Sequence, residues 1–222
     1  MNDSQFLTVA ETAEALAVTP RHARRLADNG AVTRVARGII DRESVDRYLA
    51  SQRQSRTRAW SAQTAWAAAA LLSGRTPDWL GATQTSRLRH SLREITTADE
   101  LITRMRGRSQ VRTFDAHRAA LSRLRRLVVM SDQSQLGLSG TTDDIVDGYI
   151  EGDQIGEVVR SLGLRPAVHG NVTLRSVTCD FEQVRPLITT RAAAALDAAV
   201  STDPRTRGVG EQALEEILEA RT

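Results

Sequence analysis

Two helix-start signals near the beginning of the chain constrain its fold more than any other feature. Thr8 opens a Thr-x-x-Glu capping box with Glu11, whose side chains accept hydrogen bonds from N–H groups left free in a helix's first turn. Thr19 followed by Pro20 marks a second start, because threonine caps helices and proline suits their first position. Gly30 supplies a left-handed residue at which the second helix should end. The pattern predicts two short helices joined by a tight turn.

The next twenty residues predict a hairpin and a third helix. Residues 31–40 (AVTRVARGII) alternate imperfectly and contain Gly38, which is typical of a short β-hairpin or an extended arm. Asp41 then caps a predicted helix over 42–50, whose inward-facing residues are Val45, Tyr48 and Leu49.

The remainder of the chain predicts helices first, then helices mixed with strands. Helices are expected over 61–72, 83–94, 97–107, 116–127 (capped by Asp115), 151–164, 187–200 and 208–220. Strands are expected over 111–114, 128–130, 145–150 and 171–178.

Charge is distributed unevenly along the chain. All 30 basic residues are arginines and 27 residues are acidic, for a net charge of +3. Residues 1–58 carry 10 arginines and 7 acids, residues 59–130 carry 12 and 5, and residues 131–222 carry 8 and 15, so the three balances are +3, +7 and −7. A basic front part indicates a nucleic-acid partner. Arginines scattered over solvated helix faces are the alternative.

The predicted second helix carries the best candidates for DNA contact. In a helix-turn-helix, the second helix enters the major groove and its N-terminal residues reach base edges. In this chain, that end carries Thr19, Arg21, His22, Arg24 and Arg25. Arg34 and Arg37 stand where the hairpin, acting as a wing, would touch the DNA backbone. Arginine can bind either guanine or phosphate. The sequence therefore does not separate arginines that read bases from arginines that position the protein on the DNA backbone. A solvated helical hairpin remains the alternative.

This front part resembles a known family. The run FLTVAETAEALAVTPRHARRLADNGAVTRVARGIIDRESVDRYL is similar to the winged helix-turn-helix of the excisionase and MerR-like group. The resemblance lies in the Thr-Val-x-Glu start, the Val-Thr-Pro-Arg helix, the wing and the final Val-x-x-Tyr-Leu helix. The wing, VARGII, has fewer arginines than is usual in that group and no aromatic residue.

The rest of the chain has a resemblance of its own. The runs DDIVDGYIEGDQIGEVVRSLGLRP, GNVTLRSV and TDPRTRGVGEQALEEILEA are similar to actinobacterial antitoxins of the abortive-infection (AbiEi-like) type IV toxin–antitoxin class. The resemblance implies a protein that represses its own operon through the winged domain. It also implies a cognate toxin of the nucleotidyltransferase type.

Together these observations predict an α+β, mostly helical fold. We expect a winged helix-turn-helix, then a helical segment, then a small α/β antitoxin-like domain. The predicted boundaries are 1–52 for the DNA-binding domain, 53–58 for a linker, 59–130 for the basic helical segment and 131–222 for the acidic domain.

Signals for an enzyme are weak, so we expect no catalytic residue, metal or cofactor. Asp115 and His117 could form a catalytic pair, but Asp115 is better explained as a helix cap. Asp143, Asp144 and Asp147 could bind a divalent cation, but a solvated acidic loop is the simpler interpretation. The four histidines follow no metal-ligand spacing, and the glycines form no phosphate-binding loop.

Cysteine content and hydropathy bear on the compartment. The single cysteine, Cys179, excludes an internal disulfide framework and is expected to be inert. No signal peptide and no run of 18 apolar residues is found, so we expect a cytoplasmic protein without membrane association.

The leading hypothesis is therefore a sequence-specific autorepressor that binds promoter DNA and neutralises a nucleotidyltransferase-type toxin. It would bind inverted half-sites in the promoter as a dimer or as two monomers. One alternative is a ligand-responsive transcriptional regulator without a toxin, and another is a DNA-processing enzyme.

Overall fold

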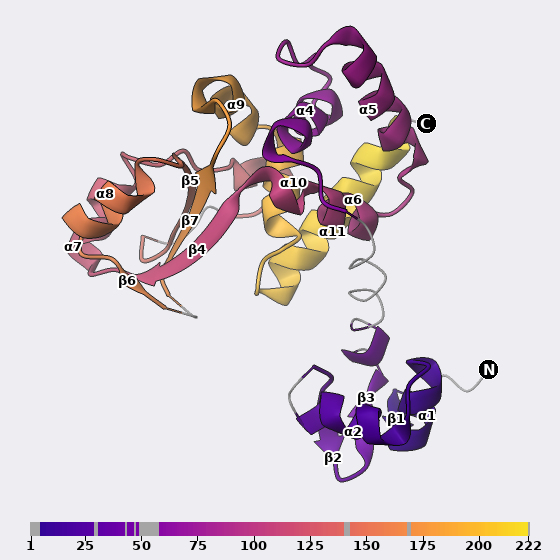
Figure 1. Ribbon diagram of the computed structural model, residues 1–222. Helices are drawn as coiled ribbons and strands as arrows, with labels where there is room; N and C mark the ends of the chain where they lie inside the picture. Colours follow the sequence, from indigo (N-terminus) through magenta and orange to yellow (C-terminus); the bar gives the residue numbers. More distant parts are fainter. Residues whose placement is uncertain are drawn as a thin grey trace. The chain divides into compact units, whose positions relative to one another are not determined.

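The computed structural model describes residues 5–28, 31–42, 44–46, 48, 58–139, 143–167 and 170–221. The chain divides into two compact units, Met1–Arg58 and Ala59–Thr222 (Figure 1). Helices predominate and two small sheets accompany them, which confirms the α+β, mostly helical prediction. Within the described residues, no helix has the length and apolar character needed to cross a membrane. Two residues named in the sequence predictions, Gly30 and Leu49, lie outside the described residues. The same is true of all but the last residue of the linker and of one of the four histidines, His169.

The first unit combines short helices with a three-stranded antiparallel sheet. Its elements are β1 (Phe6–Thr8), α1 (Val9–Ala15), α2 (Pro20–Asp28), β2 (Arg34–Ala36) and β3 (Ile39–Asp41), followed by helical residues at 42, 44–46 and 48. The strand order is β1-β3-β2, so the predicted hairpin β2–β3 is present and gains a third strand from the chain start. The core of this unit consists of Leu16, Leu26, Val32, Ile40 and Val45.

The predicted caps define where α1 and α2 begin. Thr8 N donates to Glu11 Oε2 at 2.7 Å while Glu11 N donates to Thr8 Oγ1 at 3.2 Å, which completes the capping box. His22 N donates to Thr19 Oγ1 at 3.3 Å, so Thr19 caps α2. Ala17, in the turn between the helices, has a φ of 50° in the left-handed region.

The second unit is larger and begins with helices. Its elements are α4 (Ala62–Leu72), α5 (Ala82–Glu94), α6 (Ala98–Met105), the 3-10 turn η1 (Arg106–Arg108), β4 (Gln110–Asp115), α7 (Arg118–Leu124), η2 (Gln133–Leu136), β5 (Val146–Glu151), α8 (Ile155–Ser161), β6 (Arg165–Pro166), β7 (Val172–Val177), α9 (Phe181–Ile188), α10 (Arg191–Ala198) and α11 (Pro204–Glu219). Ser61 and Thr97 cap α4 and α6, as their sequence positions predict.

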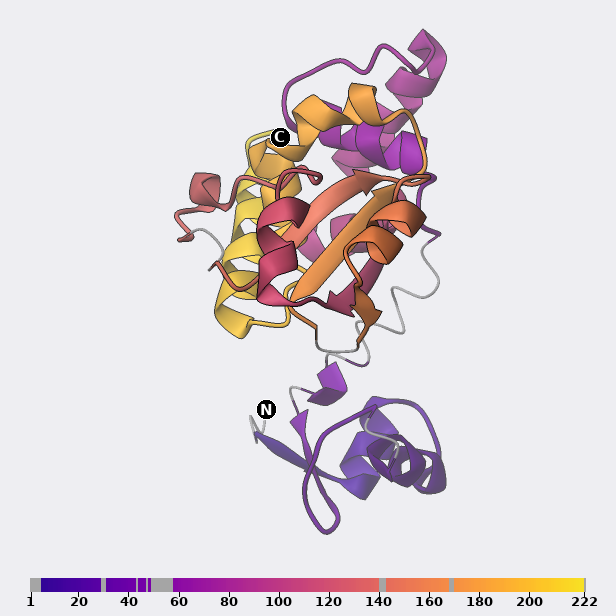
Figure 2. The ribbon, with the colours of Figure 1, turned by 90° about the vertical axis from the view of Figure 1, so that its left-hand side faces the viewer.

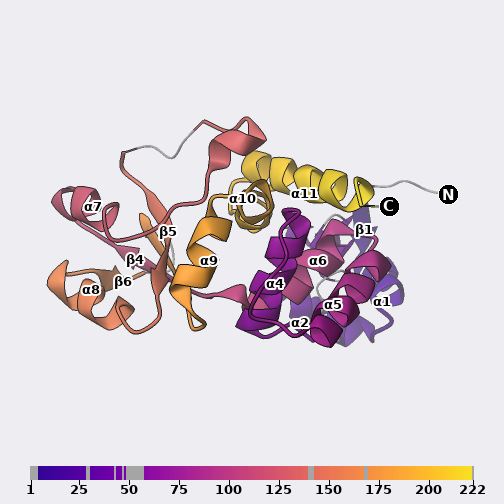
Figure 3. The ribbon, with the colours of Figure 1, turned by 90° about the horizontal axis from the view of Figure 1, so that it is seen from above.

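The sheet of this unit lies between two layers of helices. Its order is β5-β7-β4-β6, with β5 parallel to β7 and β4 antiparallel to both β7 and β6. Figure 2 shows α7 and α8 over one face, where Phe114, Leu121, Ile150, Val158 and Leu174 pack together. Figure 3 shows α9 and α10 on the other side of the sheet, with α4, α5, α6 and α11 of the same unit beyond them.

The predicted segments 59–130 and 131–222 lie together in the second compact unit. Strand β4 from the first segment pairs with β7 from the second over the register from Gln110↔Ser176 to Phe114↔Val172. Trp66 from α4 packs edge-on against Tyr149 from β5, with ring centroids 5.4 Å apart. Neither segment could satisfy these hydrogen bonds and contacts alone.

Several element boundaries also differ from the predictions. His117, not Asp115, caps α7, since His117 Nδ1 accepts from Ala119 N at 3.3 Å. The predicted strand 128–130 makes only an isolated bridge between Val129 and Tyr149. Helix α9 was not predicted, because Pro186 inside it reads as a helix break.

Candidate nucleic-acid interface

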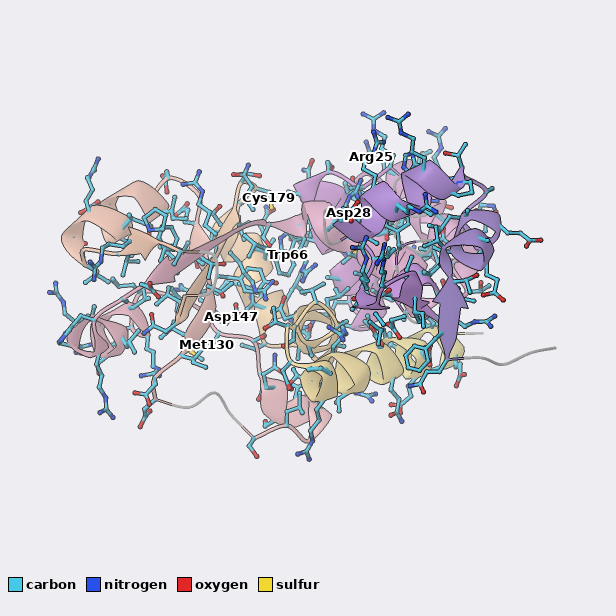
Figure 4. The ribbon with its side chains drawn as sticks, turned by 90° about the horizontal axis from the view of Figure 1, so that it is seen from below. Arg25, Asp28, Trp66, Met130, Asp147 and Cys179 are labelled. Atoms are coloured by element: carbon cyan, nitrogen blue, oxygen red, sulfur yellow. The ribbon has the colours of Figure 1, made fainter. Side chains whose placement is uncertain are left out.

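Helix α2 turns a basic face to solvent. Ala23 and Leu26 are buried and anchor the helix in the core of the first unit. Arg21, Arg24 and Arg25 are exposed, because they occupy the remaining positions of the helical repeat. Figure 4 labels Arg25 and Asp28 on this helix, and side chains with nitrogen tips project outward from it. The local pattern therefore presents guanidinium groups on a firmly packed helix.

His22 is held by its neighbours on α2. Arg25 Nη2 lies 3.3 Å from His22 Nδ1, one helical turn away. A guanidinium has donors only, so Nδ1 must be the acceptor and the ring proton sits on Nε2. The half-buried ring therefore presents an N–H donor at its other nitrogen.

Thr19 and Pro20 set the start of the helix. The Thr19 hydroxyl oxygen already accepts the His22 amide proton, so its main role is to fix the end of α2. Its O–H group remains a donor. At such a helix end the free N–H groups and the helix dipole favour anions such as phosphate.

The hairpin carries two arginines, Arg34 and Arg37, and among the described residues only Arg34 is in an ion pair. Arg34 on β2 forms an ion pair and hydrogen bond with Asp28 at the end of α2, which ties the hairpin to the helix. Arg37 occupies the hairpin turn beside Gly38, whose φ is 80°. Among the described residues, Arg37 makes no ion pair, and it is exposed. Within the described residues, the unpaired positive charge of the hairpin therefore lies at its tip.

Not all arginines of the basic segment 59–130 are available to a ligand. Arg108 is buried with its guanidinium bonded to Tyr149 Oη at 3.2 Å and Asp197 Oδ1 at 2.8 Å. Arg118 Nε lies 3.3 Å from Asp144 Oδ1. The +7 balance of this segment therefore overstates its free charge.

The acidic candidates for a metal site are each engaged by an arginine. Asp147 accepts from Arg175 Nε at 2.7 Å and Nη2 at 2.8 Å, and Asp144 pairs with Arg118. Asp143 Oδ1 lies 3.9 Å from Arg125 Nη1. In the described part of the chain, no three His, Cys, Asp or Glu side chains are grouped to hold a metal ion.

A buried polar network in the second unit was missed by sequence reasoning. It joins Arg108, Tyr149, Arg175 and Asp197, with Asp147 at its edge (Asp147 is labelled in Figure 4). Burial raises the pKa of Tyr149 well above its usual value, so the phenol stays protonated and donates to Asp197 Oδ1 at 2.7 Å. Buried arginines look like surface arginines in a sequence, and their partners lie far along the chain.

The catalytic candidates are not assembled into a site. His117 is used as the α7 cap, while Asp115 ends β4 in an exposed position. Cys179 is half-buried, and burial raises the pKa of its thiol, which disfavours the reactive thiolate. His90 Nε2 lies 3.3 Å from Glu94 Oε1 on an exposed face of α5.

Comparisons with known proteins do not assign this chain to a family. Searches of protein-family models, of curated proteins and of solved structures find no match to this chain.

Proposed function

We propose that the first unit is a winged helix-turn-helix and that the protein is a sequence-specific DNA-binding repressor of its own operon. The observation that carries the proposal is the outward face of α2. There, exposed Arg21 and Arg24 make no ion pair within the described residues, while buried Ala23 and Leu26 hold the helix rigidly. Unpaired guanidinium groups need not break an existing ion pair on binding, and the helix backbone that carries them is already ordered.

In this proposal α2 lies in the major groove. Arg21, at the first turn, reaches base edges, where a guanidinium can donate two hydrogen bonds to guanine O6 and N7. Arg24 and Arg25 lie on the groove walls within reach of phosphates. Arg37 at the hairpin tip contacts the backbone as the wing, and Arg34 keeps the hairpin in place through Asp28.

A single α2 helix reads only a few base pairs, so two copies are expected on one promoter. Inverted half-sites about one helical turn apart would place two such helices in successive major grooves. A dimer, or two monomers bound side by side, would satisfy this arrangement.

The DNA-binding proposal is tested by titrating a labelled duplex taken from upstream of the reading frame. The Arg21→Ala/Arg24→Ala variant should lose at least about tenfold in affinity, because one good base contact is worth about 1–3 kcal/mol. Arg160→Ala/Arg165→Ala removes the same charge from exposed positions of the second unit and serves as the control. Equal affinities for both variants and the wild type would exclude α2 as the reading helix.

We further propose that the protein is the antitoxin of a nucleotidyltransferase-type toxin. Support comes from the resemblance of residues 131–222 and from the acidic balance of −7 in that segment, which suits a basic protein surface. Co-expression with the product of the adjacent gene should rescue growth. If that product is not toxic, a ligand-responsive regulator without a toxin becomes the better assignment.

A further inference from the structure

A hollow in the second unit lies where the ends of α5 and α11 meet the start of α6. Figures 1 and 3 show the end of α11 beside α5 and α6. The hollow has a volume of about 470 Å³, within the size range of small-molecule sites. Its apolar lining comes from Leu92, Ile95 and Leu218, which are buried members of the main core.

Arg221 brings an unsatisfied donor to this hollow. Its Nη1 is buried and has no hydrogen-bond partner among the residues that the structure describes. A buried N–H group without an acceptor costs free energy, and a charged one costs more than a neutral one. An oxyanion placed against Arg221 would remove this cost.

Positive charge accumulates around the same point. Arg93 also lines the hollow, and Arg89 lies one helical turn before it on α5. Burial lowers the pKa of Arg221, and the charges of Arg93 and Arg89 lower it further. Among the described residues, none of these three arginines forms an ion pair. In the described part of the chain, no carboxylate lies within ion-pair distance to offset the repulsion between these guanidinium groups.

Other lining groups define what else a ligand would carry. Thr96 and Thr97 supply hydroxyl groups, although Thr97 Oγ1 already accepts from Glu100 N at 3.3 Å. Glu215 and Glu219 line the hollow from α11, and neither makes an ion pair with Arg93 or Arg221. Their carboxylates would accept hydrogen bonds from hydroxyl or amino groups of a ligand.

We propose that this hollow binds a small phosphorylated molecule that also carries hydroxyl or amino groups, such as a sugar phosphate or a mononucleotide. The phosphate lies against Arg93 and Arg221, where its three oxygens meet guanidinium donors in charge-assisted bonds. The carbon skeleton covers Leu92 and Leu218, and the donor groups face Glu215. This site is separate from the DNA-binding surface proposed for α2.

The test uses thermal unfolding of the full chain with inorganic phosphate, ribose 5-phosphate and AMP, and with ribose and adenosine as phosphate-free counterparts. Ligands that bind only the folded state raise Tm as their concentration rises. We expect a saturable rise with at least one ester and a smaller rise with phosphate, but none with ribose or adenosine. No rise with any of the three phosphates would overturn the proposal, as would an equal rise with the phosphate-free compounds.

Arg221→Met separates binding from stability. The variant should have a Tm at or above that of the ligand-free wild type, because it removes an unsatisfied buried donor. Its affinity for the esters should fall at least about tenfold, since hydrogen bonds to charged groups are among the stronger ones. Arg126→Met, at an exposed arginine after α7, should leave the ligand response unchanged. An unchanged response in Arg221→Met would overturn the assignment of the site.

A duplex DNA titration distinguishes a small ligand from a DNA backbone. Arg93→Ala/Arg221→Met should bind DNA like the wild type. If this variant instead loses DNA affinity and no phosphate compound raises Tm, the arginines contact DNA and the proposal fails. Conversely, the Arg21→Ala/Arg24→Ala variant should keep the full response to the esters, whether or not α2 binds DNA.

Discussion

Arg108 Nη2 donates a hydrogen bond to Asp197 Oδ1 at 2.8 Å, and both side chains are almost completely excluded from solvent. Tyr149 donates to the same oxygen at 2.7 Å, and Arg175 Nη1 lies 3.4 Å from it. Asp147 compensates Arg175 from its other side. One carboxylate on α10 thus holds groups from η1, β5 and β7, and connects the helices of the second unit to its sheet.

Removing Asp197 should destabilise the second unit severely. In Asp197→Ala, Arg108 and Arg175 would remain buried without their shared counter-ion, and breaking a buried pair in this way costs about 3–5 kcal/mol. Urea unfolding of the full chain measures the loss. Asp153→Ala, at an exposed carboxylate on the loop before α8, should change stability by no more than about 0.5 kcal/mol. Similar losses in both variants would contradict a central role for the network.

The same network predicts a loss of stability in acid. Burial alone would raise the pKa of Asp197, but the charges of Arg175 and Arg108 and the bond from Tyr149 lower it below its usual value. A lowered folded-state pKa means that ionised Asp197 stabilises the fold fully above its unfolded-state pKa of about 3.9. This contribution is lost as the pH falls below that value through the folded-state pKa.

The pH effect is measured by comparing the wild type with Asp197→Asn, which cannot ionise at this position. Their difference in unfolding free energy should stay constant between about pH 5 and 8 and shrink towards about pH 3. Asp153→Asn, at an exposed carboxylate, serves as the control variant. A difference that grows in acid would mean that Asp197 is not held ionised by its arginines.

Two glycines of α11 should respond oppositely to alanine. A Cβ on Gly210 would lie 2.3 Å from Ala199 N and 2.8 Å from Ala195 O, because α11 crosses α10 there at close range. A Cβ on Gly208 would meet nothing within 4 Å.

Gly208→Ala should therefore stabilise the protein by about 0.5–1 kcal/mol through helix propensity. Gly210→Ala should destabilise it by about 1–3 kcal/mol, since the neighbouring backbone must shift. Urea unfolding of both variants tests the contrast, and stabilisation by both would show that the helices separate easily.

Local chemistry made four of the helix starts predictable. Thr8, Thr19, Ser61 and Thr97 all cap helices as expected, because a cap depends on residues within one turn. The same rule applied to Asp203 and Pro204 would have placed the start of α11 correctly.

What could not be predicted depends on residues far apart in the chain. Strand β4 pairs with β7 and so joins residues 59–130 and 131–222 into one unit. The sequence of neither strand indicates this pairing. Burial of Arg108 requires Asp197, which is 89 residues away. In the candidate interface, the exposure of Arg21 and Arg24 followed from helical periodicity, whereas the pairing of Arg34 with Asp28 required the fold.

Replacing Ala17 with glycine should stabilise the first unit. Its φ of 50° costs an alanine about 1–2 kcal/mol, whereas glycine adopts this region freely. The greater conformational freedom of glycine in the unfolded state offsets about 0.4–1 kcal/mol of this gain, so Ala17→Gly should stabilise the fold by about 0–1.6 kcal/mol. Hydrogen exchange of the α1 and α2 amides in the full chain measures the change. Ala10→Gly, within α1 and also exposed, should lower protection instead.

The salt dependence of DNA binding should separate Arg37 from Arg34. Each phosphate contact adds about one unit to the slope of log affinity against log salt concentration. Arg37→Ala should reduce the slope by about 1, because its charge is uncompensated among the described residues. Arg34→Ala should leave the slope nearly unchanged, because Asp28 already neutralises that arginine.

Asp28→Asn gives the converse test of the hairpin. It frees the Arg34 guanidinium, so the slope should become steeper and affinity at low salt should rise. Arg34→Ala in the Asp28→Asn background should return the slope to the wild-type value. An equal reduction of the slope in Arg34→Ala and Arg37→Ala would place both arginines on the DNA, and the ion pair with Asp28 would then have to open on binding. An unchanged slope in both variants would exclude the hairpin from the DNA contact.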